Sequence, residues 1–163
     1  MIMNAFIAHL VASWSSAYAG SGLLRTFVGF IHIAGLVAGG GAAIAADRAT
    51  LAAARMGSDI RARQLTSIHA THRIVIIGLG AVIASGVLLF AADTATYLTS
   101  RLFWVKMGLL ALLMVNGAVL MRVGQRAGSG DERAWNTLRH TAVVSLALWF
   151  LTTLAGAGLP NAG

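Results

Sequence analysis

The stretch that decides the fold is Arg25-Thr-Phe-Val-Gly-Phe-Ile-His32-Ile-Ala-Gly-Leu-Val-Ala-Gly-Gly-Gly41, where one histidine interrupts an uncharged apolar segment. An ionisable side chain at membrane depth is costly and normally faces a bundle interior or a cofactor. In a helix, His32 shares a face with Gly35 and Gly39, because residues three or four apart are neighbours. Arg25 lies on the same stripe at its outer mouth. The glycines leave little bulk beside the imidazole, so either another helix packs closely there or a flat ligand lies against it.

The composition is that of an integral membrane protein. Hydrophobic residues make up 58% of the 163 and charged residues 10%, whereas about a quarter of a soluble domain is charged. Cysteine is absent, which excludes disulfides, thiolate-ligated iron–sulfur clusters and covalently attached c-type haem. The net charge of +7 comes from residues at the ends of apolar segments, where orientation signals belong, so no nucleic-acid partner is expected.

The apolar runs predict an all-α fold, an up-and-down four-helix transmembrane bundle in a single domain covering 1–163. Each span needs about 20 apolar residues, and the predicted spans are 23–46, 67–92, 102–123 and 134–156. Residues 1–20 are predicted to form an interfacial helix, because Trp14 and Tyr18 with three serines suit the membrane surface. A partial fifth span is the second choice for this segment.

Basic residues predict how the bundle is oriented. They concentrate in the links between the first and second spans and between the third and fourth spans: Arg48, Arg55, Arg61, Arg63, Arg122, Arg126, Arg133 and Arg139. Cytoplasmic links carry the excess of Lys and Arg. We therefore expect a multi-pass protein of the bacterial inner membrane with both termini in the periplasm.

The heights of the ionisable groups along the bundle follow from the helical rise of about 1.5 Å per residue. Toward the cytoplasm, His72 and His140 come within a turn of each other, with His69 and Asp47 about a turn nearer the surface. His32 is expected on the order of 15 Å further outward. The sequence therefore predicts an inner and an outer set of polar groups.

The inner set suggests a bis-imidazole b-type haem held by His72 and His140, since the second and fourth spans are diagonal partners in such a bundle. Alternatively, His69 and His72, spaced i and i+3, form a copper, zinc or iron site that Asp47 completes. A third interpretation makes the three histidines interfacial polar residues beside arginines.

The outer set suggests a second b-type haem, or another porphyrin, with His32 as its ligand. Gly35 and Gly39 would admit the macrocycle, and Arg25 would neutralise a propionate. In the alternative interpretation, the His32 imidazole bonds to another span and the glycines serve helix packing.

The third span supplies the other outer candidates. His32 is expected to lie level with Ile83 of the second span, and Lys106 and Met107 about a turn outside it. These two side chains are the candidates for a sixth haem ligand. In the alternative interpretation, Lys106 is a lysine that snorkels outward to the membrane surface.

Two segments resemble known families. His32-Ile-Ala-Gly-Leu in the first span, the basic and acidic link after it, and Phe103-Trp104-Val-Lys106-Met in the third span resemble the copper-resistance CopD domain. The chain is also similar to the membrane-bound protoporphyrinogen oxidase HemJ over residues 25–123. In HemJ a first-span histidine and a tryptophan-associated lysine are linked to haem or porphyrin binding, and the resemblance implies that role for His32 and Lys106.

The first functional hypothesis is a haem-binding subunit with one or two b haems, which carries electrons between the quinone pool and a periplasmic partner. It would work beside other membrane or periplasmic redox subunits rather than as a stand-alone enzyme. The alternatives are a HemJ-like enzyme that oxidises porphyrinogen, a copper- or zinc-handling membrane protein, and a cofactor-free structural subunit of a larger complex.

Overall fold

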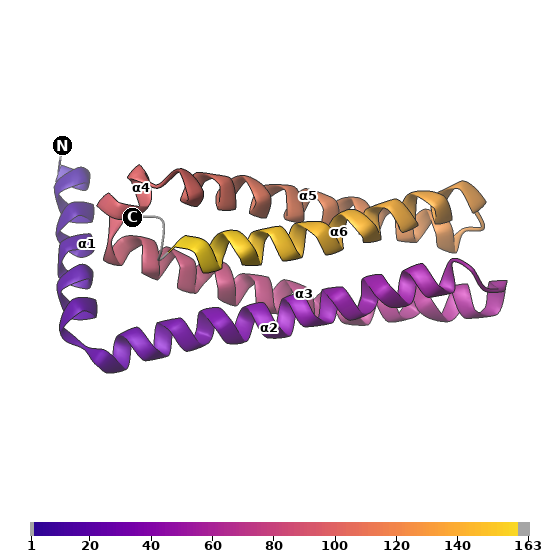
Figure 1. The fold of residues 1–163 in the computed structure, drawn as a ribbon, viewed down its shortest axis with the longest axis horizontal. Coiled ribbons are helices and arrows are strands. Elements are labelled where there is room, and N and C mark those ends of the chain that lie inside the picture. Colours follow the sequence, from indigo (N-terminus) through magenta and orange to yellow (C-terminus); the bar gives the residue numbers. More distant parts are fainter. Residues whose placement is uncertain (1, 160–163) are drawn as a thin grey trace.

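The computed structural model describes residues 2–159. Within them the chain forms helices and no strand: α1 (Ile2–Gly20), α2 (Gly22–Ala53), α3 (Ser58–Ala92), α4 (Thr94–Thr99), α5 (Arg101–Gly128) and α6 (Glu132–Gly158). Helices α2, α3, α5 and α6 are long and apolar enough to cross a membrane. Each predicted span lies inside one of these four, and the predicted all-α membrane bundle is confirmed (Figure 1).

The helix ends follow from local sequence. The Ser21 hydroxyl accepts a hydrogen bond from the backbone N–H of Leu24 at the start of α2. The Asp131 carboxylate accepts one from the backbone N–H of Arg133 at the start of α6. Such side chains satisfy N–H groups that have no partner within the helix. Between α5 and α6, Gly130 has a φ of +93°, a conformation that favours glycine. Asp59 lies in the first turn of α3, after the N-cap Gly57.

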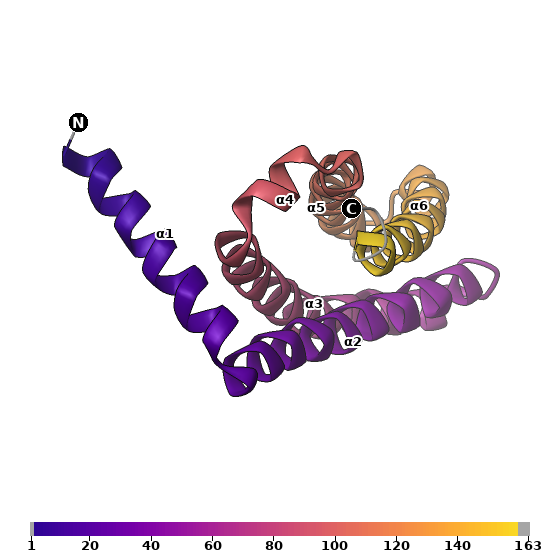
Figure 2. The same cartoon turned by 60° about the vertical axis from the view of Figure 1, so that its left-hand side comes forward.

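The four spans form a closed ring in the order α2, α3, α5, α6, so that α3 and α6 are diagonal. Helix α1 lies across one end of this bundle (Figures 1 and 2). It is fixed to the end of α3 by two hydrogen bonds: Trp14 Nε1 donates to the Leu88 carbonyl at 2.8 Å, and Ser15 Oγ donates to the Ala92 carbonyl at 2.7 Å. This transverse position suits the interfacial helix expected for residues 1–20.

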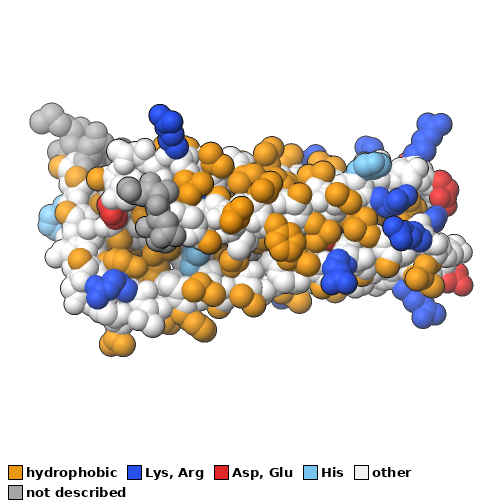
Figure 3. Space-filling model, in the orientation of Figure 1, with side chains coloured by type: hydrophobic (Ala, Val, Ile, Leu, Met, Phe, Trp, Pro, Cys, Tyr) orange, Lys and Arg blue, Asp and Glu red, His pale blue; other side chains and the backbone are white. Residues whose placement is uncertain are grey.

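The side chains of the spans have the distribution expected in a bilayer. Large apolar residues face outward, among them Phe30 and Phe150, which are 64% and 65% exposed. Lys and Arg side chains gather at the end that holds the α2–α3 and α5–α6 turns, next to a broad hydrophobic surface (Figure 3). An apolar surface with a basic end is typical of a multi-pass membrane protein.

Arg61 of α3 joins the two turns at the basic end. Its guanidinium donates to the Ala54 carbonyl at 3.0 Å, forms an ion pair with Glu132 at 3.0 Å, and lies 5.3 Å from the centre of the Trp135 ring. These contacts link the end of α2 to the start of α6. A guanidinium can serve all three because it presents several donors and a flat face.

We expect the substitution Arg61→Ala to lower the free energy of unfolding by about 1–2 kcal/mol, because it removes a cation–π contact and charge-assisted hydrogen bonds. Reversible unfolding in bicelles measures the change. The control is Arg63→Ala, which removes an exposed arginine from the same turn of α3. Equal stability of the two variants would show that the Arg61 contacts do not hold the turns together.

Candidate functional site

His32 of α2 bonds to α3 in the outer half of the bundle. Its Nδ1 lies 2.9 Å from the Oγ of Ser85, which is 1% exposed. The Ser85 hydroxyl has one proton and donates it to the Ala81 carbonyl at 2.6 Å. Only its lone pairs remain for the imidazole, so His32 donates from Nδ1. The Nε2 atom of a neutral His32 is therefore an acceptor that can bind a proton or a metal.

The His32 tautomer can be checked by nitrogen NMR of the histidine-labelled protein in lipid. We expect His32 to be the Nδ1–H tautomer in the native chain and a mixture of tautomers in Ser85→Ala, because that substitution removes the Ser85 oxygen that accepts the Nδ1 proton. Ser67→Ala is a matched control on the same helix. An Nε2–H tautomer in the native chain would contradict the assignment.

The glycines beside His32 serve a helix contact. A Cβ on Gly35 would lie 2.8 Å from the Gly78 carbonyl oxygen, and one on Gly39 would lie 3.2 Å from the Gly78 Cα. Helix α3 thus fills the space that a macrocycle was expected to occupy. The alternative interpretation, close helix packing, describes Gly35 and Gly39 in this structure.

Arg25 is hydrogen-bonded to the end of α1. Its guanidinium donates to the carbonyls of Tyr18 and Ala19 at the end of α1. A cation at a helix C-terminus satisfies carbonyls that have no partner within the helix. Arg25 therefore holds the junction between α1 and α2, and the structure gives it no contact toward His32.

Lys106 of α5 lies in the same part of the bundle as His32. It is partly buried, with Nζ 3.3 Å from the position of a Cβ on Gly156 of α6. The Lys106 side chain therefore packs against α6.

The inner histidines do not converge. His69 and His140 are exposed, and each ring bonds to its own helix: His69 Nδ1 to the Leu65 carbonyl at 3.1 Å and His140 Nδ1 to the Asn136 carbonyl at 2.7 Å. Among residues 2–159 no three His, Asp or Glu side chains are grouped to hold a metal ion. The predicted cluster of Asp47, His69, His72 and His140 is thus not assembled. His72 alone of the three histidines faces the interior.

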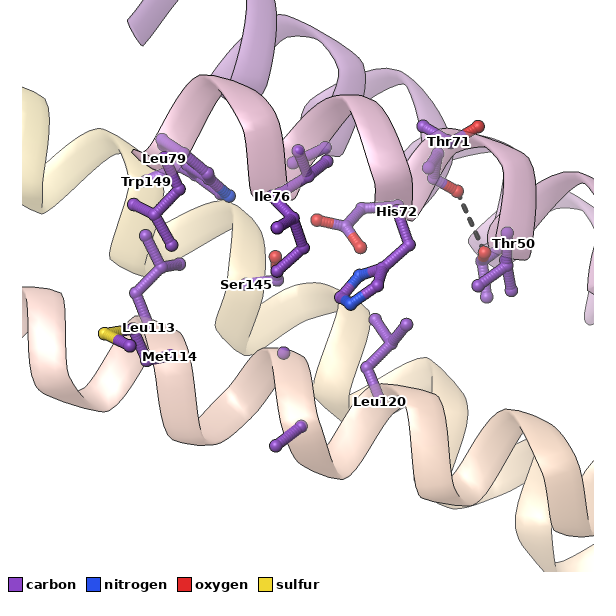
Figure 4. Close-up of a pocket in the computed structure, with 17 residues that line it drawn as sticks. Thr50, Thr71, His72, Ile76, Leu79, Leu113, Met114, Leu120, Ser145 and Trp149 are labelled. Atoms are coloured by element: carbon purple, nitrogen blue, oxygen red, sulfur yellow. Dashed lines mark hydrogen bonds between the residues drawn. The ribbon is translucent and has the colours of Figure 1, made fainter. Parts of the chain in front are cut away.

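A cavity of about 210 Å³ lies in the inner half of the bundle, and all four spans line it. Asp47 of α2 and His72 of α3 are its titratable residues, and Ser145 and Trp149 line it from α6. Figure 4 shows the His72 imidazole and the Ser145 side chain directed into the space between α3, α5 and α6. Apolar side chains and small residues complete the wall.

Asp47 is a carboxyl group buried inside the bundle on α2. It is 3% exposed, and its Oδ2 makes no hydrogen bond within residues 2–159. The neighbouring Thr50 hydroxyl is already engaged, since it donates to the Ala46 carbonyl at 2.8 Å and accepts from Gln64 at 3.2 Å. A buried carboxylate oxygen without a partner is costly unless a proton, cation or ligand compensates it.

Comparison with known protein families, curated proteins and solved structures gives no match. The sequence patterns around the histidines did not point to Ser85 or Ser145, although small polar residues recur on the buried face of α6 at Thr141, Ser145 and Thr152. That recurrence is the signal by which a polar interior face can be found.

Proposed function

We propose that this chain is a proton-coupled membrane protein whose protonation site is the inner cavity, with Asp47 as the group that takes up and releases the proton. The single observation that carries the proposal is the Asp47 Oδ2 atom, which is buried, lacks a hydrogen bond to a described residue, and belongs to the cavity that His72 also lines. Ionisable residues at membrane depth mark proton and substrate paths.

His72 is the second titratable residue of the proposed protonation site, beside Asp47. The described lining of the cavity contains no other acid or base, and no hydrogen bond joins the His72 ring to the residues drawn in Figure 4. An imidazole changes charge between about pH 5 and 8, which suits proton exchange under physiological conditions. With the basic end in the cytoplasm of a bacterium, the cavity lies in the cytoplasmic half of the membrane.

Infrared difference spectra of the protein in lipid, recorded through a pH titration, test the proposal. The chain has only five acids, so a protonated-carboxyl band can be assigned by substitution. We expect a band that is absent in Asp47→Asn and retained in Asp59→Asn, which removes an exposed aspartate of α3. A spectrum unchanged by Asp47→Asn would refute Asp47 as the protonation site.

A second candidate function is electron transfer through a b-type haem between the quinone pool and a periplasmic partner. The observation that favours it is the contact of His32 Nδ1 with Ser85 Oγ at 2.9 Å, which leaves Nε2 free to serve as an axial ligand. The protein purified after expression with haem should then show a reduced-minus-oxidised haem spectrum that is lost in His32→Ala. Native protein without a Soret band would remove this candidate.

A further inference from the structure

The inner cavity opens sideways toward lipid. Ile76 of α3 and Met114 of α5 both line it, yet they are 54% and 51% exposed on the outer surface of the bundle. They therefore form a rim between α3 and α5, in the apolar belt of the protein. Gly117 on α5 also lines the cavity and has no side chain to narrow it. A ligand dissolved in the bilayer can reach Asp47 by this route without crossing water.

The size of the cavity limits the ligand to about one ring. A cavity of roughly 150 Å³ in another protein holds benzene, and the cavity here measures about 210 Å³. Pockets for drug-sized ligands are larger, about 300–1,000 Å³. The cavity thus suits a single substituted ring, and a longer tail would remain outside in the bilayer.

The wall chemistry favours an aromatic ring that carries a hydrogen-bond donor. Trp149 supplies an aromatic surface, and the Met114 thioether is a group that makes favourable contacts with aromatic rings. Asp47 Oδ2 is an acceptor without a described partner, so the ligand group that reaches it must donate. A hydroxyl on the ring meets this requirement.

We propose that the cavity binds the ring of a membrane-soluble phenol, which enters between α3 and α5 and donates its hydroxyl proton in a hydrogen bond to Asp47. His72 lies beside the bound hydroxyl, and an alkyl tail leaves through the rim at Ile76 and Met114. This inference rests on the proposed function, because the same carboxyl group serves as the protonation site and as the acceptor for the ligand.

The test compares 4-octylphenol with 4-octylanisole, in which a methyl group replaces the hydroxyl hydrogen, so that the ether oxygen cannot donate. Binding to the native chain in nanodiscs is measured with radiolabelled probe, and retention by protein-free nanodiscs is subtracted. We expect saturable binding of the phenol and at least about ten-fold weaker binding of the anisole, since a hydrogen bond to a charged acceptor is lost. Equal binding of the two probes overturns the proposal.

A pair of glycine variants tests the location. A Cβ on Gly117 would meet nothing within 4 Å, and the same is true of Gly108 on the same helix, which does not line the cavity. Gly117→Leu should abolish phenol binding by filling the cavity, while Gly108→Leu should bind as the native chain does. Equal loss in both variants, or in neither, overturns the proposed site. Absent phenol binding with an intact Asp47 infrared band refutes only this inference, whereas loss of both refutes the proposed function as well.

Discussion

The variant Gly78→Ala is expected to be the most destabilised single-methyl substitution in the bundle. A Cβ at this position would lie 2.6 Å from both the Cα and the N of Gly39 and 2.7 Å from the Gly35 carbonyl oxygen. These are backbone atoms, so the methyl group can be accommodated only if α2 and α3 move apart. Overpacking typically lowers the free energy of unfolding by about 1–3 kcal/mol. For Gly78→Ala we expect a loss in the upper part of that range or beyond it.

The matched control is Gly80→Ala, two residues further along α3, where a Cβ meets nothing within 4 Å. Both substitutions remove one glycine from the same helix, so a change in helix propensity affects them alike. Reversible unfolding in bicelles gives the two free energies. If Gly78→Ala were as stable as Gly80→Ala, the close contact between α2 and α3 at this level would be disproved.

The second large effect is a gain in stability. Asp47→Leu should raise the free energy of unfolding by about 1–3 kcal/mol, because it replaces a buried carboxyl group, whose Oδ2 makes no hydrogen bond within residues 2–159, with an apolar side chain. The cavity of about 210 Å³ gives the extra methyl groups room. The measurement is the same unfolding assay, with Asp59→Leu as the control at an exposed aspartate.

The expected gain has a functional meaning, since an acid that reduces stability is normally retained for another reason. Asp47→Leu should therefore be more stable while lacking the infrared carboxyl band proposed for the native chain. A variant less stable than the native protein would show that Asp47 is compensated by contacts, and it would remove the physical basis for treating the carboxyl group as unsatisfied.

Heights along the bundle could be predicted from the sequence. His32 was expected level with Ile83 and bonds to Ser85, half a turn away. The rise per residue is fixed and the turns are short, so numbering alone sets which residues of neighbouring spans are level. Phe90 and Phe103, whose ring centres lie 5.5 Å apart, follow the same register.

The direction in which each side chain points could not be obtained in this way. His140 was placed at the height of His72, but the buried face of α6 runs through Leu138, Thr141 and Ser145, and His140 lies off it. The histidine therefore faces outward. In a membrane helix the lipid-facing side is as apolar as the interior, so the hydrophobic pattern does not mark the inner face.

The role of a glycine also depends on its partner. Gly35 and Gly39 of α2 contact Gly78 of α3. The sequence around each glycine does not indicate this contact, because the partner lies on another span. Small residues permit either close helix packing or ligand access, and only the position of α3 decides between them. For the same reason, the hydrogen bonds of Arg25 to the end of α1 could not be predicted without the position of α1.

The measurement that tests the central claim most directly is the infrared titration of the Asp47 carboxyl band in His72→Gln. If the two residues share one cavity as a protonation site, their titrations are coupled, and removal of the imidazole should shift the midpoint of the Asp47 band by about one pH unit or more. His140→Gln, which removes an exposed imidazole from α6, should leave the midpoint unchanged. An Asp47 band with the native midpoint in His72→Gln would contradict the account.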